Sequence, residues 1–284
     1  MAVDTTDTQG VPDQGETDTT AATVHLRHTT EGLSIARKVL RYGAMPLFLL
    51  VVLTGLYLWV QSLQLDSIEQ RQLNASFIIG KLREHVRAST LSTALVILLA
   101  VPMGILATRP TLKRFAPALI GFGNFGQAIP SLGLLTLIFL LARAGIVPGL
   151  PSTGLIPVVV ALTAYSILPI LRNTMVGLQQ VDDSLLEAGR GMGLSNTGVL
   201  RRIEMPLAVP VILAGVRTAL IINVGTAALV FLYGGGGLGE LIFQGFQLRR
   251  LPILMTGAVL TAALALLVDY LAGLVEEFLT PRGL

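Results

Sequence analysis

The feature that most constrains the fold is a series of long apolar blocks that contain almost no charge. A helix needs about 20 apolar residues to cross a hydrocarbon core of about 30 Å. Six blocks meet or approach this length, and they cover residues 43–63, 88–108, 117–141, 154–176, 209–232 and 251–274. Charged residues make up only 13% of the chain, against about 25% in soluble proteins. The sequence therefore predicts an all-α membrane protein with six transmembrane helices.

Prolines fall within these blocks or at their edges, among them Pro130, Pro169 and Pro210. Membrane helices tolerate proline where neighbouring helices satisfy the freed carbonyl group. We expect kinks at these positions rather than helix ends.

The blocks also divide the chain. Residues 1–40 are polar and predict a disordered cytoplasmic tail. Residues 41–65 hold a first transmembrane helix, which we expect to be retained because no small-residue cleavage site follows it. Residues 66–87 read as an external amphipathic segment at the membrane interface. The main transmembrane domain then covers 88–276, and 277–284 form a short cytoplasmic tail.

The basic residues cluster at the ends of the apolar blocks. With the N-terminus inside, more lysines and arginines fall on the cytoplasmic side than outside, although Lys81 to Arg87 oppose this bias. The positive-inside rule therefore favours a multi-pass protein of the cytoplasmic (inner) membrane with both termini in the cytoplasm. No basic face of the kind that neutralises many phosphates is present, which argues against a nucleic-acid partner.

Several chemistries are excluded by residue type. The chain has no cysteine, so disulfides, thiolate metal sites and cysteine nucleophiles are ruled out. We interpret His25, His28 and His85 as solvated surface histidines, and we predict no catalytic residues, metal or bound cofactor. The single Gly-Lys pair, at Gly80 and Lys81, lacks the remainder of a P-loop. If ATP is used, it must bind another polypeptide, and the chain is no enzyme by itself.

The polar loop 179–206 between the fourth and fifth blocks is rich in helix signals. Asp182 or Asp183 can cap a first short helix, Gly191 and Gly193 end it, and Ser195 or Asn196 can cap a second. A helix, a glycine turn and a second helix form a docking element on the cytoplasmic surface. The alternative is an amphipathic loop that rests on lipid headgroups.

The order Glu187-Ala188-Gly189, three residues, Gly193, nine residues, Ile203-Glu204-Met205-Pro206 resembles the EAA loop of ABC importer permeases. That motif runs Glu-Ala-Ala, three residues, Gly, nine residues, Ile-x-Leu-Pro, so Gly189 and Met205 depart from it. In that family the loop is the coupling helix that seats in the ATPase subunit. The resemblance implies an ATPase-coupling site made of Glu187, Ala188, Gly189, Gly193, Leu194, Ile203 and Pro206.

Further segments resemble the subfamily that imports glycine betaine, choline, carnitine and similar osmoprotectants. They are Val101 to Arg109, Gln127 to Leu135, Arg172 to Gly177, Glu187 to Leu194, Pro206 to Ala219 and Gly236 to Phe246. The resemblance implies a type I ABC importer permease (MetI-like) bundle. Its expected partners are two P-loop ATPase subunits that carry ATP and Mg, a second permease copy or a homologous permease, and an extracytoplasmic substrate-binding protein.

Polar residues within the predicted spans are candidates for a translocation pathway. They are Gln127, Pro130 and Ser131 in the third block, and Asn223 in the fifth. The competing interpretation is hydrogen bonding between helices. Asp269 lies near the cytoplasmic end of the last block, where we expect it to pair with an arginine rather than relay protons.

Two alternatives stay open. The chain is also compatible with an ABC permease for methionine, phosphonate or another amino acid derivative. A secondary transporter is a further alternative, but it needs carboxylates at the midplane, and the only candidate carboxylate in a span is Asp269, near one end. Quaternary ammonium groups are bound by aromatic cages, and we find no obvious aromatic cluster in the sequence. High-affinity recognition is therefore expected to reside in a separate binding protein.

Overall fold

The computed structural model describes residues 42–279 and consists there of helices and connecting loops. The chain divides into two units, residues 1–50 and 51–284. The described part of the first unit is the start of a helix, Tyr42–Gln61. The helices that follow it are α2 (Ser67–Gln72), α3 (Ala75–Thr108), α4 (Ala116–Ala128), α5 (Ser131–Arg143), α6 (Leu155–Gln179), α7 (Asp183–Gly191), α8 (Asn196–Val199), α9 (Met205–Thr226), α10 (Gly239–Gln247) and α11 (Leu251–Leu279).

Five continuous helical segments of the described chain are long and apolar enough to cross a membrane, namely Tyr42–Gln61, α3, α6, Asn196–Tyr233 and α11. The pair Lys113–Ala128 and Ser131–Arg143 gives a sixth if the two helices count as one bent span. The all-α prediction with six candidate spans is therefore confirmed, with the third span broken in the middle.

The break at Pro130 corrects one expectation, because the two helices meet there at 104°. A proline disfavours helical geometry in the residue before it. Ile129 is accordingly extended, with φ −78° and ψ 131°, and Pro130 stands outside α5 as its N-cap. The expected kink is therefore a helix end. Pro169 and Pro210, by contrast, lie inside α6 and α9, which continue through them.

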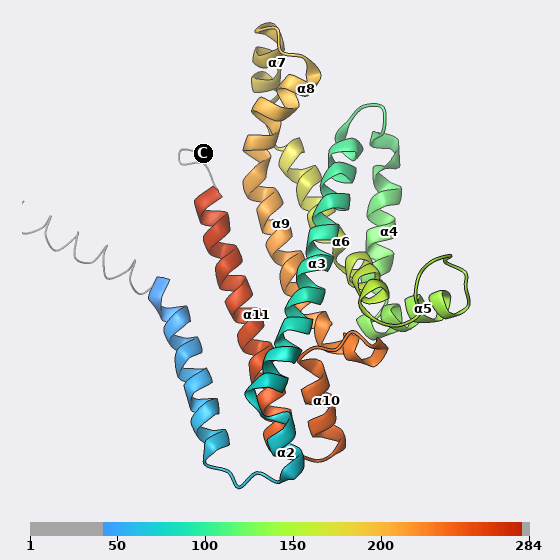
Figure 1. Cartoon of the computed structure of the whole chain (residues 1–284). Helices are drawn as coiled ribbons and strands as arrows, with labels where there is room; N and C mark the ends of the chain where they lie inside the picture. The colour runs from blue at the N-terminus through green and yellow to red at the C-terminus, as the bar shows by residue number, and fades with distance from the viewer. Residues whose placement is uncertain (1–41, 280–284) are drawn as a thin grey trace, which may run out of the picture. The chain divides into compact units, whose positions relative to one another are not determined.

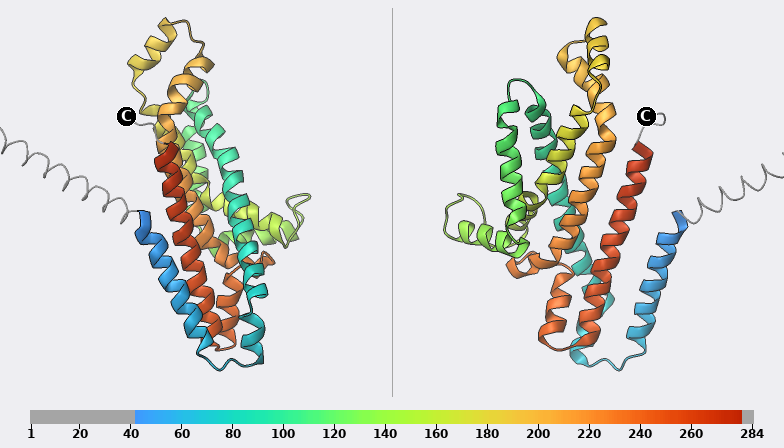
Figure 2. Two further views of the ribbon diagram at one scale, coloured as in Figure 1. Left: turned by 60° about the vertical axis from the view of Figure 1, so that its left-hand side comes forward. Right: turned by 180° about the vertical axis from the view of Figure 1, so that it is seen from behind.

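Within the second unit, α6 packs against α3 and α9, and α11 packs against α9 and α10. Figures 1 and 2 show α7 and α8 at one end of this bundle and α2 and α10 at the other. We call these the α7 end and the α10 end. The long helix α3 runs from α2 toward the α7 end, and α5 lies across the bundle (Figure 1).

Small residues let the long helices approach closely. A Cβ atom built on Gly104 of α3 would lie 2.7 Å from Cβ of Thr174 in α6. A Cβ atom on Gly215 of α9 would lie 2.7 Å from Cβ of Asn173. Both distances are shorter than van der Waals contact, so each glycine permits a crossing that a side chain would block.

The segment 66–87 comprises α2 and the first turns of α3. Asp66 caps α2 by accepting hydrogen bonds from the amides of Ile68 and Glu69, and the carboxylate of Glu69 accepts one from the amide of Asp66. The bond from the Glu69 amide is the largest cause that holds the pKa of Asp66 below its usual value, and the Ile68 amide and Arg250 add to it. The predicted tail 1–40 and residues 280–284 lie outside the described residues.

The interpretation of His85 as a solvated histidine is wrong. Its side chain is fully buried in α3, and Nε2 lies 2.9 Å from the carbonyl oxygen of Val224 in α9. The contact joins positions 139 residues apart, so sequence proximity to a polar segment could not show it. His25 and His28 lie outside the described residues.

Candidate functional site

Helix α7 begins after a capping aspartate and is followed by a glycine turn, the two local signals that the sequence predicted. The carboxylate of Asp182 accepts a hydrogen bond from the amide of Ser184 at 2.8 Å, which lowers the pKa of Asp182. Gly193 follows the helix with φ +84°, a conformation that favours glycine. Ser195 then caps α8 by accepting a hydrogen bond from the amide of Gly198 at 3.2 Å. The predicted helix, glycine turn and second helix are confirmed.

The element has a packed inner face and an exposed outer face. Gly189 is buried, and a Cβ atom built on it would lie 2.5 Å from Cδ1 of Ile203, so α7 rests against the segment that leads into α9. Glu187 and Ala188 are exposed. Met192 is also exposed, at 76% of its surface.

The remaining candidates of the EAA motif divide in the same way. Gly193 and Pro206 are exposed, whereas Leu194 and Ile203 are partly buried between the two short helices. The structure therefore separates residues that shape the element from those that face outward, a distinction that the linear motif does not contain.

An ion pair that sequence reasoning missed ties this loop to α3. Arg109, the residue after α3, donates from Nη1 to Oε1 of Glu204 at 3.0 Å, and its Nη2 contacts Oε2. Glu204 is buried and lies in the π-helical segment Leu200–Glu204 that precedes α9. Paired contacts between a guanidinium and a carboxylate fix the orientation of both groups. The only signal in the sequence was an acidic residue inside the motif itself.

A second ion pair joins α9 to α11. Arg217 donates from Nε to Oδ1 of Asp269 at 2.6 Å, and its Nη1 lies 3.4 Å from Oε2 of Glu276. The prediction that Asp269 pairs with an arginine is confirmed.

The structure brings three of the four pathway candidates together. Gln127 ends α4 next to the bend, Pro130 occupies the bend and Ser131 begins α5. Asn223 lies elsewhere, fully buried between α9 and α3, where its Nδ2 donates to Oγ1 of Thr93 at 2.9 Å. This is the hydrogen bond between helices that the competing interpretation required. The pathway role itself stays a prediction.

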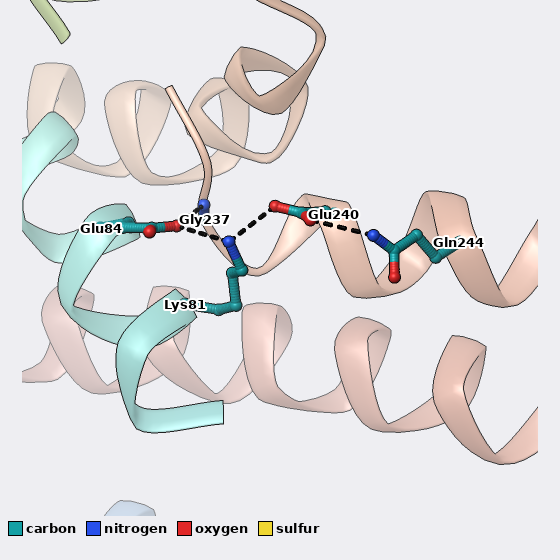
Figure 3. Close-up of polar contacts among 5 residues, drawn as sticks. All are labelled: Lys81, Glu84, Gly237, Glu240 and Gln244. Atoms are coloured by element: carbon teal, nitrogen blue, oxygen red, sulfur yellow. Dashed lines mark hydrogen bonds and ion pairs between the residues drawn. The ribbon is translucent and has the colours of Figure 1, made fainter. Parts of the chain in front are cut away.

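A polar cluster occupies the α10 end (Figure 3). Nζ of Lys81 lies 3.1 Å from Oε2 of Glu84 and 2.8 Å from Oε2 of Glu240. Glu84 also accepts a hydrogen bond from the amide of Gly237 at 2.9 Å. Glu240 accepts one from Nε2 of Gln244 at 2.9 Å. Lys81 therefore connects α3 to α10 through Glu240, and Glu84 connects the same part of α3 to the glycine run.

The glycine run 234–237 allows this arrangement. Three of its members have positive φ, at Gly234, Gly236 and Gly237. A Cβ atom on Gly236 would lie 2.0 Å from Oε2 of Glu84. The run is thus a tight turn held against α3. Among the described residues, no group of histidine and acidic side chains is arranged to hold a metal ion.

A cavity of about 710 Å³ opens beside the cluster, between α3, the 3-10 helix Ala227–Tyr233 and α10. Its wall includes the rings of Phe231 and Phe243, whose centroids are 4.9 Å apart. The sequence showed no obvious aromatic cluster, and the structure brings these two rings together at the cavity. The two rings belong to different helices on either side of the glycine run, so the pair forms only in the fold.

Comparisons with known proteins agree with these features. The family model described as binding-protein-dependent transport system inner membrane component matches residues 100–282. The chain is 41% identical over 213 residues to the glycine betaine/carnitine/choline transport system permease protein OpuCB of Bacillus subtilis (strain 168), covering 75% of this chain and 93% of that protein. It is 38% identical over 235 residues to the osmoprotectant import permease protein OsmY of Salmonella typhimurium, covering 83% and 94%.

Among solved structures, the inward-facing MetNI methionine ABC transporter matches with a TM-score of 0.61 and 25% identity. The match covers 72% of this chain and 96% of that one. A chain of an amino acid ABC transporter matches with the same TM-score at 18% identity, which shows a shared fold.

Proposed function

This chain belongs to the family of binding-protein-dependent transport system inner membrane components, and from that membership we propose that it is the permease subunit of an osmoprotectant importer. The cargo is glycine betaine or a related quaternary amine, which the chain moves across the inner membrane. The names of two relatives at about 40% identity support this substrate class.

ATP hydrolysis is assigned to a separate P-loop ATPase that docks on the loop 179–206. The observation that carries this assignment is the capped α7–α8 pair, with Gly189 packed inside and Glu187 and Met192 exposed. Two ATPase subunits, with their ATP and Mg, would bind two permeases, either two copies of this chain or one copy and a homologue. An extracytoplasmic binding protein would deliver the substrate.

The proposed orientation rests on the ATPase-docking role of the α7–α8 loop and on the basic residues near it, although Lys81, Arg83 and Arg87 at the α10 end oppose this bias. Lys113, Arg114, Arg190, Arg201 and Arg202 all belong to segments at the α7 end. The positive-inside rule assigns that end to the cytoplasm. The α10 end, with its cavity, then faces the binding protein, and both termini of the chain are cytoplasmic.

Helix α3 offers a route for the ATP-driven movement. It has 34 residues and is therefore about 51 Å long. At the α7 end it connects through Arg109 to Glu204, and at the α10 end Glu84 holds the glycine run. When the ATPases close, α7 and α8 move with α6 and α9, and the ion pair carries α3 along. The glycine run at the far end shifts with it and opens the cavity outward.

Uptake of radiolabelled glycine betaine at high salt tests the function and the coupling together. Cells with the wild-type permease accumulate the label, and cells with Glu187→Arg lose uptake while the permease remains in the membrane at its normal level. Full uptake by Glu187→Arg would contradict the docking assignment. Absence of uptake by the wild type would contradict the substrate assignment.

The fold similarity to the methionine transporter supports a second candidate, a permease for another small amino acid derivative. Competition of the labelled uptake by methionine, phosphonate and carnitine separates the two. Copurification of a P-loop ATPase in mild detergent separates both from a secondary transporter, which needs no ATPase.

A further inference from the structure

We propose that the cavity at the α10 end is a substrate site on the permease itself, built for quaternary amines that carry a carboxylate. In this site Arg87 binds the carboxylate, and Phe231 and Phe243 hold the ammonium group. The inference rests on the proposed function and narrows its substrate class to zwitterions.

The cavity has the dimensions of a small-molecule site. Its volume of about 710 Å³ falls in the range of about 300–1,000 Å³ that ligand pockets occupy. Its wall combines the start of α3, Leu155 of α6 and the segment 231–247, which are distant in sequence, so its shape depends on the folded bundle. The backbone of Gly234 to Gly236 forms part of that wall, and the missing side chains leave room for a ligand there.

The charges of the wall single out Arg87. Lys81 lies between the carboxylates of Glu84 and Glu240, which compensate its charge. Within residues 42–279, the guanidinium of Arg87 has no hydrogen-bond or ion-pair partner, although it borders the same cavity. Glu84 and Arg87 are three residues apart and therefore share one face of α3. The described wall thus offers one guanidinium without a direct partner, and a guanidinium binds a carboxylate through paired hydrogen bonds.

The aromatic pair supplies the second half of the site. A quaternary ammonium group has no N–H to donate, so aromatic faces bind it through their negative quadrupole. Phe231 and Phe243 are partly buried, border the cavity and are tilted by 41° to each other. A ligand with a quaternary ammonium at one end and a carboxylate at the other matches both features.

This assignment separates two cargos that the relatives' names place together. Glycine betaine and carnitine carry a carboxylate, whereas choline carries a hydroxyl group in its place. Only the zwitterions gain the charged hydrogen bonds from Arg87, so this residue selects for them.

The test measures binding of radiolabelled glycine betaine and of choline to the purified permease–ATPase complex without the binding protein. We expect saturable binding of glycine betaine that weakens by about tenfold or more in Arg87→Gln, because charged hydrogen bonds are lost. Choline binding should change less than about twofold, and Arg87→Lys should recover only part of the betaine affinity, because lysine keeps the charge but lacks the paired donors. Arg83→Gln is the matched control, since Arg83 is an exposed residue of the same helix that does not border the cavity.

Two results would overturn the site: no saturable binding of glycine betaine to the wild-type complex, or equal affinities in wild type and Arg87→Gln. A parallel loss of betaine and choline binding would overturn the role of Arg87 in selection. Uptake by cells that carry the complete importer distinguishes a failure of the proposed substrate site from a failure of the proposed import function. Uptake by wild-type cells without binding to the purified complex contradicts the site alone, and absence of uptake contradicts the proposed function.

Discussion

Arg109 and Glu204 lie 95 positions apart in the chain and form a two-pronged ion pair where α3 ends and the segment leading into α9 begins. The carboxylate is buried, while the guanidinium side chain is 29% exposed. The contact fixes the α7–α8 element to a third long helix in addition to α6 and α9, which it joins covalently. We therefore expect a movement of the loop 179–206 to displace α3 together with α6 and α9.

Arg109→Ala leaves the Glu204 carboxylate buried without its partner. We expect a loss of about 3 kcal/mol in stability, measured as a lower thermal unfolding midpoint of the purified complex. The double variant Arg109→Met with Glu204→Leu should recover most of the stability, because it removes both charges. If the ion pair also transmits movement, the double variant still imports poorly. Normal import by this variant would show that the pair is structural only.

Gly236→Ala should reduce import, because the added Cβ atom displaces the Glu84 carboxylate from its contacts with Gly237 and Lys81. The added Cβ atom would lie 2.0 Å from Oε2 of Glu84, and φ at this position is +65°, a conformation that costs other residues about 1–3 kcal/mol. Gly80→Ala is the control, since nothing lies within 4 Å of the position in α3. Uptake assays on both variants should give a loss only for the first. Normal uptake by Gly236→Ala would mean that the glycine turn is not held as tightly as the contacts indicate.

Gly189→Ala should be tolerated, although its Cβ atom would lie 2.5 Å from Cδ1 of Ile203. The clash is with the end of a flexible side chain, which can adopt another rotamer at a cost of about 1 kcal/mol. Alanine is also the residue in the EAA motif. Gly189→Val should instead separate α7 from Ile203 and reduce both copurification of the ATPase and uptake. Equal behaviour of the two variants would contradict the packing of the inner face.

Thr93→Val removes the hydroxyl that accepts the hydrogen bond from Asn223 while keeping the shape of the side chain. Hydrogen bonds between membrane helices contribute about 0.6–2 kcal/mol, so we expect a small drop in the unfolding midpoint and unchanged substrate preference. A changed preference in a competition assay would favour the pathway role of Asn223 instead.

The elements set by neighbouring residues were predictable from the sequence. The apolar blocks predicted the long helices, and the caps at Asp182 and Ser195 predicted the short ones, because both signals act within a few residues. The bend at Pro130 was misjudged, since proline position alone does not distinguish a kink from a helix end. That difference depends on how the neighbouring helices accommodate the freed backbone groups.

Features made by distant residues were not predictable. The burial of His85 depends on Val224, and the ring pair of Phe231 and Phe243 requires the glycine turn to fold back. The partner of Glu204 is equally remote. Each contact is decided by which faces of the helices meet, and a single sequence contains no direct signal for that choice.

Photo-crosslinking from the outer face of α7 tests the central claim most directly. The chain has no cysteine, so Met192→Cys places a unique thiol for a benzophenone label at a position that is 76% exposed. Phe246→Cys, 71% exposed at the α10 end, is the control. The account predicts that the label at position 192 crosslinks to a P-loop ATPase in native membranes and that the label at 246 does not. Crosslinks from position 192 to lipid alone would contradict it.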